Sequence, residues 1–305
     1  MNKQNIAIIG LGSMGYGMAV SLVAAGHQTH GFDINPDQMA RFQADGGAPG
    51  VLGAVVGTVD ALVVVVLNAA QTEAVLFGED GAVPQMKPGS VVMACATVPP
   101  AFARDMAARC AGHGVHYLDA PISGGSVKAA QGKLSVMAAG SDAAFAAAAP
   151  VLEAVAEKVF TLGDQAGAGS AMKAVNQLLA GVHIAAMAEA MTFGLTQGVS
   201  PEKFVEVIPE CAGTSWMLEN RAPHIVAGDY TPHSSVNIWP KDLGIVLEIA
   251  EAAGFDAPVT QAAMAQFMEA AAQGLGGEDD AAVAKVYAGQ VGVRLPGLAK
   301  PWKES

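Results

Sequence analysis

The chain has 305 residues, of which 52% are hydrophobic and only 14% are charged, so we expect a large apolar core or subunit interface. Its formal net charge of −12 excludes the extended basic surface that nucleic-acid binding requires. Cys95, Cys110 and Cys211 stand apart without metal-ligand spacing, so we expect neither a disulfide framework nor a metal site. No signal-peptide pattern precedes the first apolar run, which predicts a cytoplasmic protein.

Short apolar runs alternate with helical stretches through the first half of the chain. The runs that predict strands are 5–10, 28–33, 61–67, 90–95 and 115–120. The helical stretches between them are 14–25, 36–45, 71–77 and 99–113. Near-continuous apolar runs in this order are typical of a doubly wound, mostly parallel sheet that is covered on both faces. Two further runs, 132–140 and 158–163, flank a helical stretch at 142–156 and are expected to extend that sheet.

Helical periodicity dominates after Gly163. The helices predicted there are 169–197, 201–211, 215–227, 241–253, 257–273 and 279–288. This change predicts a Rossmann-type α/β domain over 1–165, followed by an all-helical domain over 166–305. The apolar run 171–193 is long enough to cross a membrane, but its polar residues favour the central helix of a soluble protein.

A glycine-rich motif follows the first predicted strand directly and opens the first helix. In this context Gly10 permits a tight turn, Gly12 lets the backbone approach a pyrophosphate, and Gly15 allows close packing of helix and strand. The amide groups at the helix start then face the phosphates. The motif predicts a dinucleotide site formed by Gly10, Leu11, Gly12, Ser13, Met14 and Gly15.

Asp33 ends the second predicted strand, where a carboxylate accepts hydrogen bonds from a ribose 2′-hydroxyl and repels a 2′-phosphate. The next arginine along the chain is Arg41, so we predict NAD rather than NADP. Leu67, Asn68 and Thr97 follow two further strands and should lie along the same edge of the sheet. There they serve either as cofactor contacts or as ordinary caps at strand ends.

Ser123, Gly124 and Gly125 follow the strand predicted at 115–120. The hydroxyls and backbone amide groups of this stretch predict a flexible turn that cradles the carboxylate of a small anionic substrate. A plain surface turn is the alternative.

A lone lysine, Lys173, lies on the first turns of the long apolar helix, close to the predicted domain boundary. A lysine accepts a hydroxyl proton only if its pKa falls from about 10.4 toward about 7–8, which burial and an oxidised nicotinamide both favour. Asn176 and Gln177 lie three and four residues later, on the same helix face, so either can hold the substrate hydroxyl. Lys173 is therefore the candidate general base, and a lysine that extends to solvent from a helix start is the alternative.

Two segments of the helical half carry further candidates. Lys241, in IWPKDLG, either contacts the cofactor or substrate or pairs with its neighbour Asp242. Trp216 and Asn220, with Arg221 beside them, are candidate walls of a substrate pocket.

Four motifs occur in order along the chain: GLGSMGYGMAVSL, DAPISGGSVKAAQGKLSVMAAG, GAGSAMKAVNQLLA and KDLG. In these motifs the chain resembles the 3-hydroxyisobutyrate dehydrogenase-like family, also called β-hydroxyacid dehydrogenases, over nearly its whole length. The resemblance implies a Rossmann-type domain, a helical domain that forms oligomers, and the use of NAD(P). The site residues that it implies are the catalytic Lys173 with Asn176 or Gln177, the substrate-binding Ser123, Gly124 and Gly125, and the cofactor-binding Thr97 and Lys241.

The stretches VVLNAAQ, GTSWMLENR and GDYTPHSSVNIWPKDLG are similar to family members that oxidise a four-carbon sugar acid at C2. Rival substrates within the family are tartronate semialdehyde, 3-hydroxyisobutyrate and a β-hydroxy amino acid such as phenylserine. A rival of another class is a dinucleotide-binding interaction module without turnover, against which the presence of Lys173 counts. We predict an NAD-dependent hydroxyacid dehydrogenase that binds neither nucleic acid nor a membrane and forms a homodimer or homotetramer through its helical domain.

Overall fold

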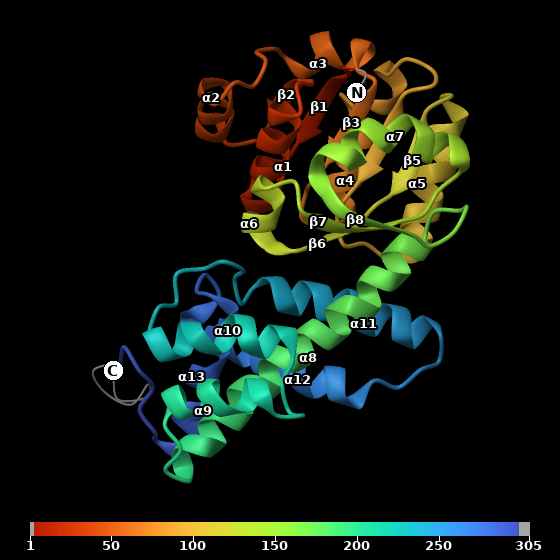
Figure 1. Cartoon of the computed structure of the whole chain (residues 1–305). Helices are drawn as coiled ribbons and strands as arrows, with labels where there is room; N and C mark the ends of the chain where they lie inside the picture. The colour runs from red at the N-terminus through yellow and green to blue at the C-terminus, as the bar shows by residue number, and fades with distance from the viewer. Residues whose placement is uncertain (1–2, 299–305) are drawn as a thin grey trace. The chain divides into compact units, whose positions relative to one another are not determined.

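The computed structural model of the chain describes residues 3–298. It divides into two compact units, Met1–Lys173 and Ala174–Ser305 (Figure 1). Within the described residues, the first unit holds all the β-strands, and the second is helical apart from one isolated bridge between Ser235 and Asp279. The predicted fold class, a doubly wound α/β region followed by a helical region, is confirmed.

The larger sheet of the first unit is parallel throughout, with the strand order β2-β1-β3-β4-β5. Its strands are β1 (Asn5–Ile9), β2 (Gln28–Phe32), β3 (Ala61–Val64), β4 (Val91–Ala94) and β5 (His116–Asp119). Every residue of β3 and β4 is buried, as expected for a sheet with both faces covered. Alternate residues contribute to different cores, so Ile6 and Ile8 of β1 belong to one and Ala7 and Ile9 to the other.

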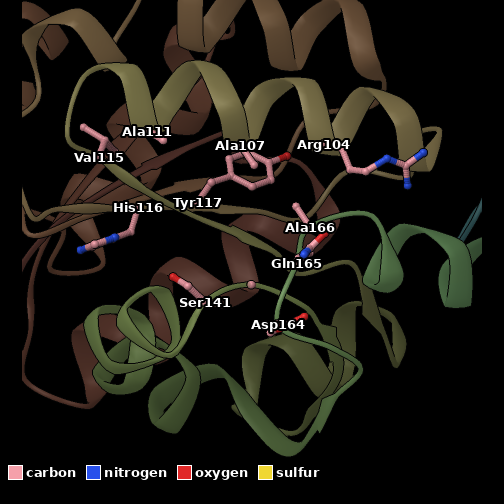
Figure 2. Close-up of a pocket in the computed structure, with 11 residues that line it drawn as sticks. Arg104, Ala107, Ala111, Val115, His116, Tyr117, Ser141, Asp164, Gln165 and Ala166 are labelled. Carbon is pink, nitrogen blue, oxygen red and sulfur yellow. The ribbon is translucent and has the colours of Figure 1, made fainter.

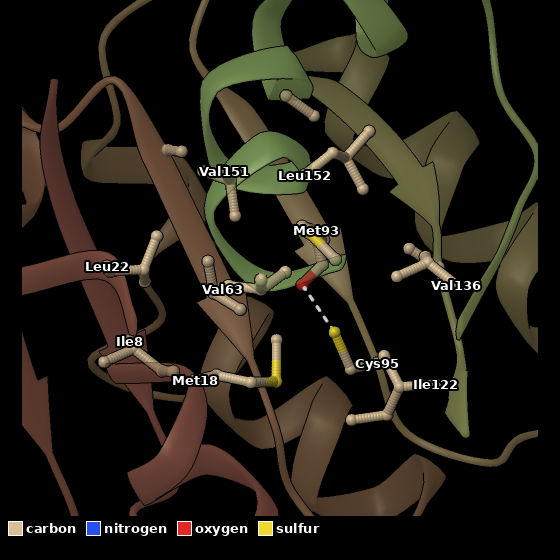
Figure 3. Close-up of a cluster of buried hydrophobic side chains, with 14 of the residues drawn as sticks. Ile8, Met18, Leu22, Val63, Met93, Cys95, Ile122, Val136, Val151 and Leu152 are labelled. Carbon is tan, nitrogen blue, oxygen red and sulfur yellow. Dashed lines mark hydrogen bonds between the residues drawn. The ribbon is translucent and has the colours of Figure 1, made fainter. Parts of the chain in front are cut away.

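Helices cover both faces of this sheet. On one face α1 (Ser13–Ala24) and α7 (Asp142–Val155) contribute side chains such as Leu22 and Val151, which lie around Val63 (Figure 3). On the other face lie α4 (Ala69–Phe77) and α5 (Pro100–Gly112). The remaining helical segments are α2 (Pro36–Ala44), α3 (Leu52–Val55), α6 (Gly125–Ala130) and the 3-10 turns Val56–Thr58 and Val83–Gln85.

The later strands form a second sheet rather than one continuous extension of the first. They are β6 (Ile122–Ser123), β7 (Leu134–Ala138) and β8 (Ala156–Thr161), in the order β6-β7-β8. The prediction of strands near 132–140 and 158–163 holds, but the prediction that they continue the parallel sheet does not. The chain reverses after β6, so both β6 and the end of β5 run antiparallel to β7, and the two sheets meet at the isolated antiparallel bridge of Asp119 with Ala139.

The second unit packs its helices around one apolar core. They are the greater part of α8 (Ala168–Thr196), then α9 (Pro201–Val207), α10 (Trp216–Ala227), α11 (Ile238–Ala252), α12 (Pro258–Ala270) and α13 (Ala284–Val291), with shorter turns at Ile208–Glu210, Ala271–Leu275 and Asp280–Val283. Local sequence determines where they begin and end: the Ser215 hydroxyl caps α10 at the Leu218 amide, and Gly228 ends that helix with a φ of 64°. In the core, the Trp239 and Phe267 rings stack at a centroid distance of 5.6 Å.

Helix α8 is a single helix of 29 residues, close to the predicted bounds of 169–197. Within the described residues it is the one helix that is long and apolar enough to cross a membrane, and 39% of its most apolar stretch is buried. The core helix of a soluble protein passes the same test of length and composition, so the observation is weak evidence for a membrane.

Candidate active site

The glycine loop turns tightly between β1 and α1. Gly10 has a φ of 95°, and a Cβ atom there would lie 2.2 Å from the carbonyl oxygen of Val65, just after β3. A Cβ atom on Gly15 would lie 1.9 Å from the Gly10 oxygen, so neither position accepts a side chain without movement of the backbone. A Cβ atom on Gly12, in contrast, would meet no described atom within 4 Å. Because α1 has neither a side-chain cap nor an acidic residue in its first turn, its amide groups suit a pyrophosphate.

A cavity of about 500 Å³ lies beside this loop. Its lining comes from the glycine loop and α1, from α2 and from α6: Leu11, Gly12, Ser13, Tyr16, Gly17, Gln38, Arg41, Ser126, Val127 and Ala130. Helices α1 and α6 can approach closely because Gly17 has no side chain. A Cβ atom there would lie only 2.7 Å from the Ala130 nitrogen. A cavity of this size, next to helix amides without a side-chain cap, fits part of a dinucleotide.

Asp33 is held against the glycine loop. Its Oδ2 atom accepts a hydrogen bond of 2.6 Å from the Leu11 amide, and its Oδ1 atom accepts one of 2.8 Å from the Asn35 amide. The carboxylate is therefore fixed beside the turn where a ribose is expected. Arg41 is nearer than its sequence separation indicated: it lines the same cavity, with its guanidinium 4.0 Å from the centroid of the Tyr16 ring. The prediction of NAD thus rests on Asp33 alone, because Arg41 lies at the same cavity.

Three other predicted cofactor residues, Leu67, Asn68 and Thr97, lie beyond strand ends of the same parallel sheet. Asn68 caps α4, since its Oδ1 atom accepts a 2.9 Å hydrogen bond from the Gln71 amide. Leu67 precedes it, is 59% exposed, and donates its amide to Gln71 Oε1 at 2.9 Å. Thr97 is buried beyond β4. Asn68 therefore forms the capping bond that we gave as the alternative to cofactor binding. Contact with a cofactor stays a prediction for all three residues.

The predicted substrate turn is ordered by its neighbours. Ser123 ends β6 and α6 begins at Gly125; Gly124 and Gly125 have φ of 139° and 77°. A Cβ atom on Gly124 would lie 3.2 Å from side-chain atoms of Leu134 and Lys128. Positive φ angles and close packing give these residues a defined path, while the carboxylate-binding role of the turn stays a prediction.

Lys173 lies next to this turn. It is 9% exposed, and its Nζ atom donates a 2.9 Å hydrogen bond to the carbonyl oxygen of Ile122, the residue before Ser123. The alternative of a lysine extended into solvent is therefore wrong. Within the first unit, the structure brings the candidate base and the candidate carboxylate turn together.

Asp119 fixes the start of the helix that carries Lys173. This carboxylate, 1% exposed at the end of β5, accepts hydrogen bonds from the Gly167 and Ser170 amides at 2.8 and 2.9 Å and from the Ser170 hydroxyl at 2.6 Å. Burial raises the pKa of the Asp119 carboxyl above its usual value, while the bonds from Ser170 and Gly167 act in the opposite direction. We did not single out Asp119 from the sequence, although a charged residue that ends an apolar strand was a usable signal.

In the second unit, Asp242 organises three predicted site residues. Its Oδ2 atom accepts a 2.5 Å hydrogen bond from Gln177 Nε2, and its Oδ1 atom lies 2.6 Å from Lys241 Nζ. Gln177 Oε1 in turn accepts a 2.9 Å hydrogen bond from Asn176 Nδ2. Lys241 thus forms the ion pair that was one of its two predicted roles. Pro240 is tolerated beside it because it lies in the first turn of α11, where a backbone donor is not needed.

Trp216 and Asn220 lie on one exposed face of α10. They are four residues apart on the helix, and the Trp216 side chain is 59% exposed. Arg221 instead turns inward and is 8% exposed. The structure therefore leaves the two residues predicted to contact substrate exposed, while their basic neighbour is buried.

A second cavity, of about 340 Å³, lies beside β5 and α5 and contains none of the predicted site residues (Figure 2). Its charged or titratable lining residues are Arg104, His116, Tyr117 and Asp164. Among residues 3–298, no group of three or more His, Cys, Asp or Glu side chains is arranged to hold a metal ion.

In this parallel sheet a glycine-rich loop follows β1, and a buried lysine lies beside the turn at Ser123. This combination is that of a nicotinamide-dependent dehydrogenase. Two family models match the chain: the NAD binding domain of 6-phosphogluconate dehydrogenase over residues 5–163, and the NAD-binding domain of NADP-dependent 3-hydroxyisobutyrate dehydrogenase over residues 167–287. The chain therefore belongs to the 3-hydroxyisobutyrate dehydrogenase-like family of NAD-dependent hydroxyacid dehydrogenases.

Relatives match over nearly the whole length. L-threonate dehydrogenase of Cupriavidus necator is 50% identical, with 98% of this chain and 100% of the relative covered. L-threonate dehydrogenase of Escherichia coli K12 is 48% identical, with 96% and 97% covered. A crystal structure of 3-hydroxyisobutyrate dehydrogenase from Salmonella typhimurium is similar with a TM-score of 0.87 and 49% identity, covering 92% of this chain and 99% of that one.

Gly15→Ala should weaken NAD binding by at least about tenfold, because the added Cβ atom would collide with the Gly10 oxygen and displace the loop. Gly112→Ala is the matched control, since a Cβ atom at the end of α5 would meet no described atom within 4 Å. Calorimetric titration with NAD gives both dissociation constants. Equal affinity in the two variants would contradict the assignment of the loop.

Proposed function

We propose that this dehydrogenase oxidises L-threonate at C2 to 2-oxo-tetronate, with NAD as the acceptor. The relatives of about half identity that carry the name L-threonate dehydrogenase support the substrate. The observation that carries the chemistry is the 2.9 Å bond from Lys173 Nζ to the Ile122 oxygen, because it holds an amine directly before the Ser123 turn.

The substrate carboxylate binds at Ser123, Gly124 and Gly125. The positive φ angles of the two glycines direct backbone amide groups into positions that an ordinary strand does not offer. The Ser123 hydroxyl adds a donor at the same turn. Ser123 follows Ile122 directly in the chain, and the Ile122 oxygen binds the Lys173 amine. A carboxylate held at Ser123 therefore lies close to that amine.

Lys173 is the general base. In its neutral form the amine donates to the Ile122 oxygen and uses its lone pair to take the proton of the C2 hydroxyl. NAD, when bound, supplies the acceptor for the hydride that leaves C2. Burial of Lys173 limits competing proton exchange with bulk water.

The C2 hydroxyl is held by Asn176 rather than by Gln177. The Gln177 amide is occupied at both ends, because it donates to Asp242 and accepts from Asn176. The primary amide of Asn176 has two N–H donors, of which one bonds Gln177 and the other is directed to substrate. Asn176 and Lys173 lie three residues apart on α8, on one helix face.

The cofactor contacts are assigned to the glycine loop, Asp33, the strand-end residues Leu67, Asn68 and Thr97, and Lys241. The domains in this proposal are an NAD-binding domain over 1–165 and a substrate and oligomerisation domain over 166–305. The protein acts in the cytoplasm as a homodimer or homotetramer through its helical domain, where Phe193, Val207 and Met268 are exposed apolar side chains. Sedimentation velocity tests the oligomer.

A panel of hydroxy acids separates the substrates. The reaction is followed by the absorbance of NADH. We expect kcat/KM for L-threonate with NAD to exceed the values for 3-hydroxyisobutyrate and phenylserine. We also expect it to exceed the value for tartronate semialdehyde, which is measured in the reductive direction. The name of the Salmonella typhimurium structure makes 3-hydroxyisobutyrate the second candidate. A higher kcat/KM for any other member would overturn the choice of L-threonate, and NAD binding without any turnover would indicate a non-catalytic interaction module.

Lys173→Ala should lower kcat by about 10²- to 10⁴-fold, because a positioned base contributes about that much to proton transfer. The dissociation constant for NAD should change little, since the glycine loop is untouched. Lys203→Ala, which removes an exposed lysine paired with Glu206, should retain normal kcat. Near-normal turnover by Lys173→Ala would rule out the mechanism.

A further inference from the structure

Arg41 brings a positive charge to the cavity of about 500 Å³ beside the glycine loop. Among the described residues that line this cavity, Arg41 is the only charged side chain. Gly12 and Ser13 line it too, at the start of α1, where no side chain caps the helix. A guanidinium group and free helix amides both bind phosphate oxygens. The cavity therefore combines two independent features that favour an anionic group, in a chain whose net charge is −12.

The position of Arg41 depends on Tyr16. The Arg41 guanidinium lies over the Tyr16 ring, 4.0 Å from its centroid. Tyr16 is itself held by α2, since its hydroxyl donates to Asp45 Oδ2 and its ring meets the Phe42 ring at a centroid distance of 6.2 Å and an angle of 77°. A Cβ atom on Gly47 would lie 2.4 Å from the Phe42 ring, so that ring is tightly enclosed. The support of the guanidinium thus extends into the core of the first unit.

The contact with Tyr16 leaves the hydrogen-bonding capacity of Arg41 unused. Among residues 3–298 its guanidinium forms no hydrogen bond and no ion pair. Arg109 on α5 provides the contrast, because it also lies 4.0 Å from a ring centroid, that of Phe77, but pairs with Glu73 at 2.7 Å. Arg41 is exposed, so a phosphate can replace the water around its donors without a change in the fold.

We propose that Arg41 binds the pyrophosphate of the dinucleotide together with the amide groups at the start of α1, and that Tyr16 is its positioning residue. The helix start offers only a partial positive charge, whereas the pyrophosphate is a dianion, and Arg41 supplies a full charge. The proposal deepens the cofactor site of the proposed function and rests on its glycine loop. It does not involve the hydroxy acid, so cofactor binding is measured without substrate.

The test is a fluorescence titration with NADH. Arg41→Gln should raise the dissociation constant of NADH about tenfold, because a charge-assisted contact with phosphate is lost. Arg109→Gln removes an arginine that lies over a ring outside the cavity, and it should leave the constant within about twofold of the wild-type value. Adenosine, which has the ribose but no phosphate, is measured by displacement of NADH. Its dissociation constant should change less than about twofold in Arg41→Gln.

A double-mutant cycle tests the role of Tyr16. Tyr16→Leu removes the ring beneath the guanidinium and should raise the dissociation constant of NADH about threefold or more. In the Arg41→Gln background the same change should add less than about twofold, since Tyr16 acts through Arg41. Tyr16→Phe keeps the ring and should retain the wild-type constant within about twofold. Fully additive losses in the cycle would overturn the positioning role.

An unchanged dissociation constant for NADH in Arg41→Gln would overturn the proposal. An equal loss for adenosine would also overturn it, because adenosine has no phosphate to lose. A loss for NADPH that exceeds the loss for NADH by about threefold or more would assign Arg41 to the 2′-phosphate instead. If the wild-type protein does not bind NADH, the cofactor site of the proposed function itself fails. That failure is distinguishable because it is seen before any substitution is made.

Discussion

The carboxylate of Asp119 is the contact on which the proposed catalytic geometry of the first unit depends. It ends β5 and accepts three hydrogen bonds from the first turn of α8, which fixes where that helix starts relative to the sheet. One turn later Lys173 meets the Ile122 oxygen. One short segment, Asp119 to Ile122, therefore holds both the start of the helix and the amine that the helix carries, and it lies at the same edge of the sheet as the glycine loop.

Buried carboxylates have the same role in the second unit. Asp242 holds Gln177 and Lys241, and Asp280 holds Arg221 and Trp239. Each is 3% exposed or less, so the loss of one partner would leave a buried charge uncompensated. This cost keeps long polar side chains in single orientations. A site that aligns a hydroxyl with a base requires such fixed orientations.

The parts of the site that follow from local pattern were predictable from the sequence. The glycine loop and Asp33 depend on spacing next to a strand, and the position of Lys173 depends on helix periodicity. Asp119 and Asp242 were missed as organising residues because their partners are distant in the chain: Gly167 is 48 residues from Asp119, and Gln177 is 65 residues from Asp242. The second sheet was merged with the first because the reversal between β6 and β7 depends on their antiparallel pairing, which no local pattern encodes.

The most direct measurement is kcat for Asp119→Ala beside Asp119→Asn. The asparagine keeps an acceptor for the Gly167 and Ser170 amides and can donate to the Ser170 hydroxyl, whereas alanine removes all three bonds. The account predicts that alanine lowers kcat by about tenfold or more, since a small displacement of Lys173 is costly, while asparagine largely preserves kcat and both variants bind NAD. A folded Asp119→Ala enzyme with the kcat of the wild type would contradict it.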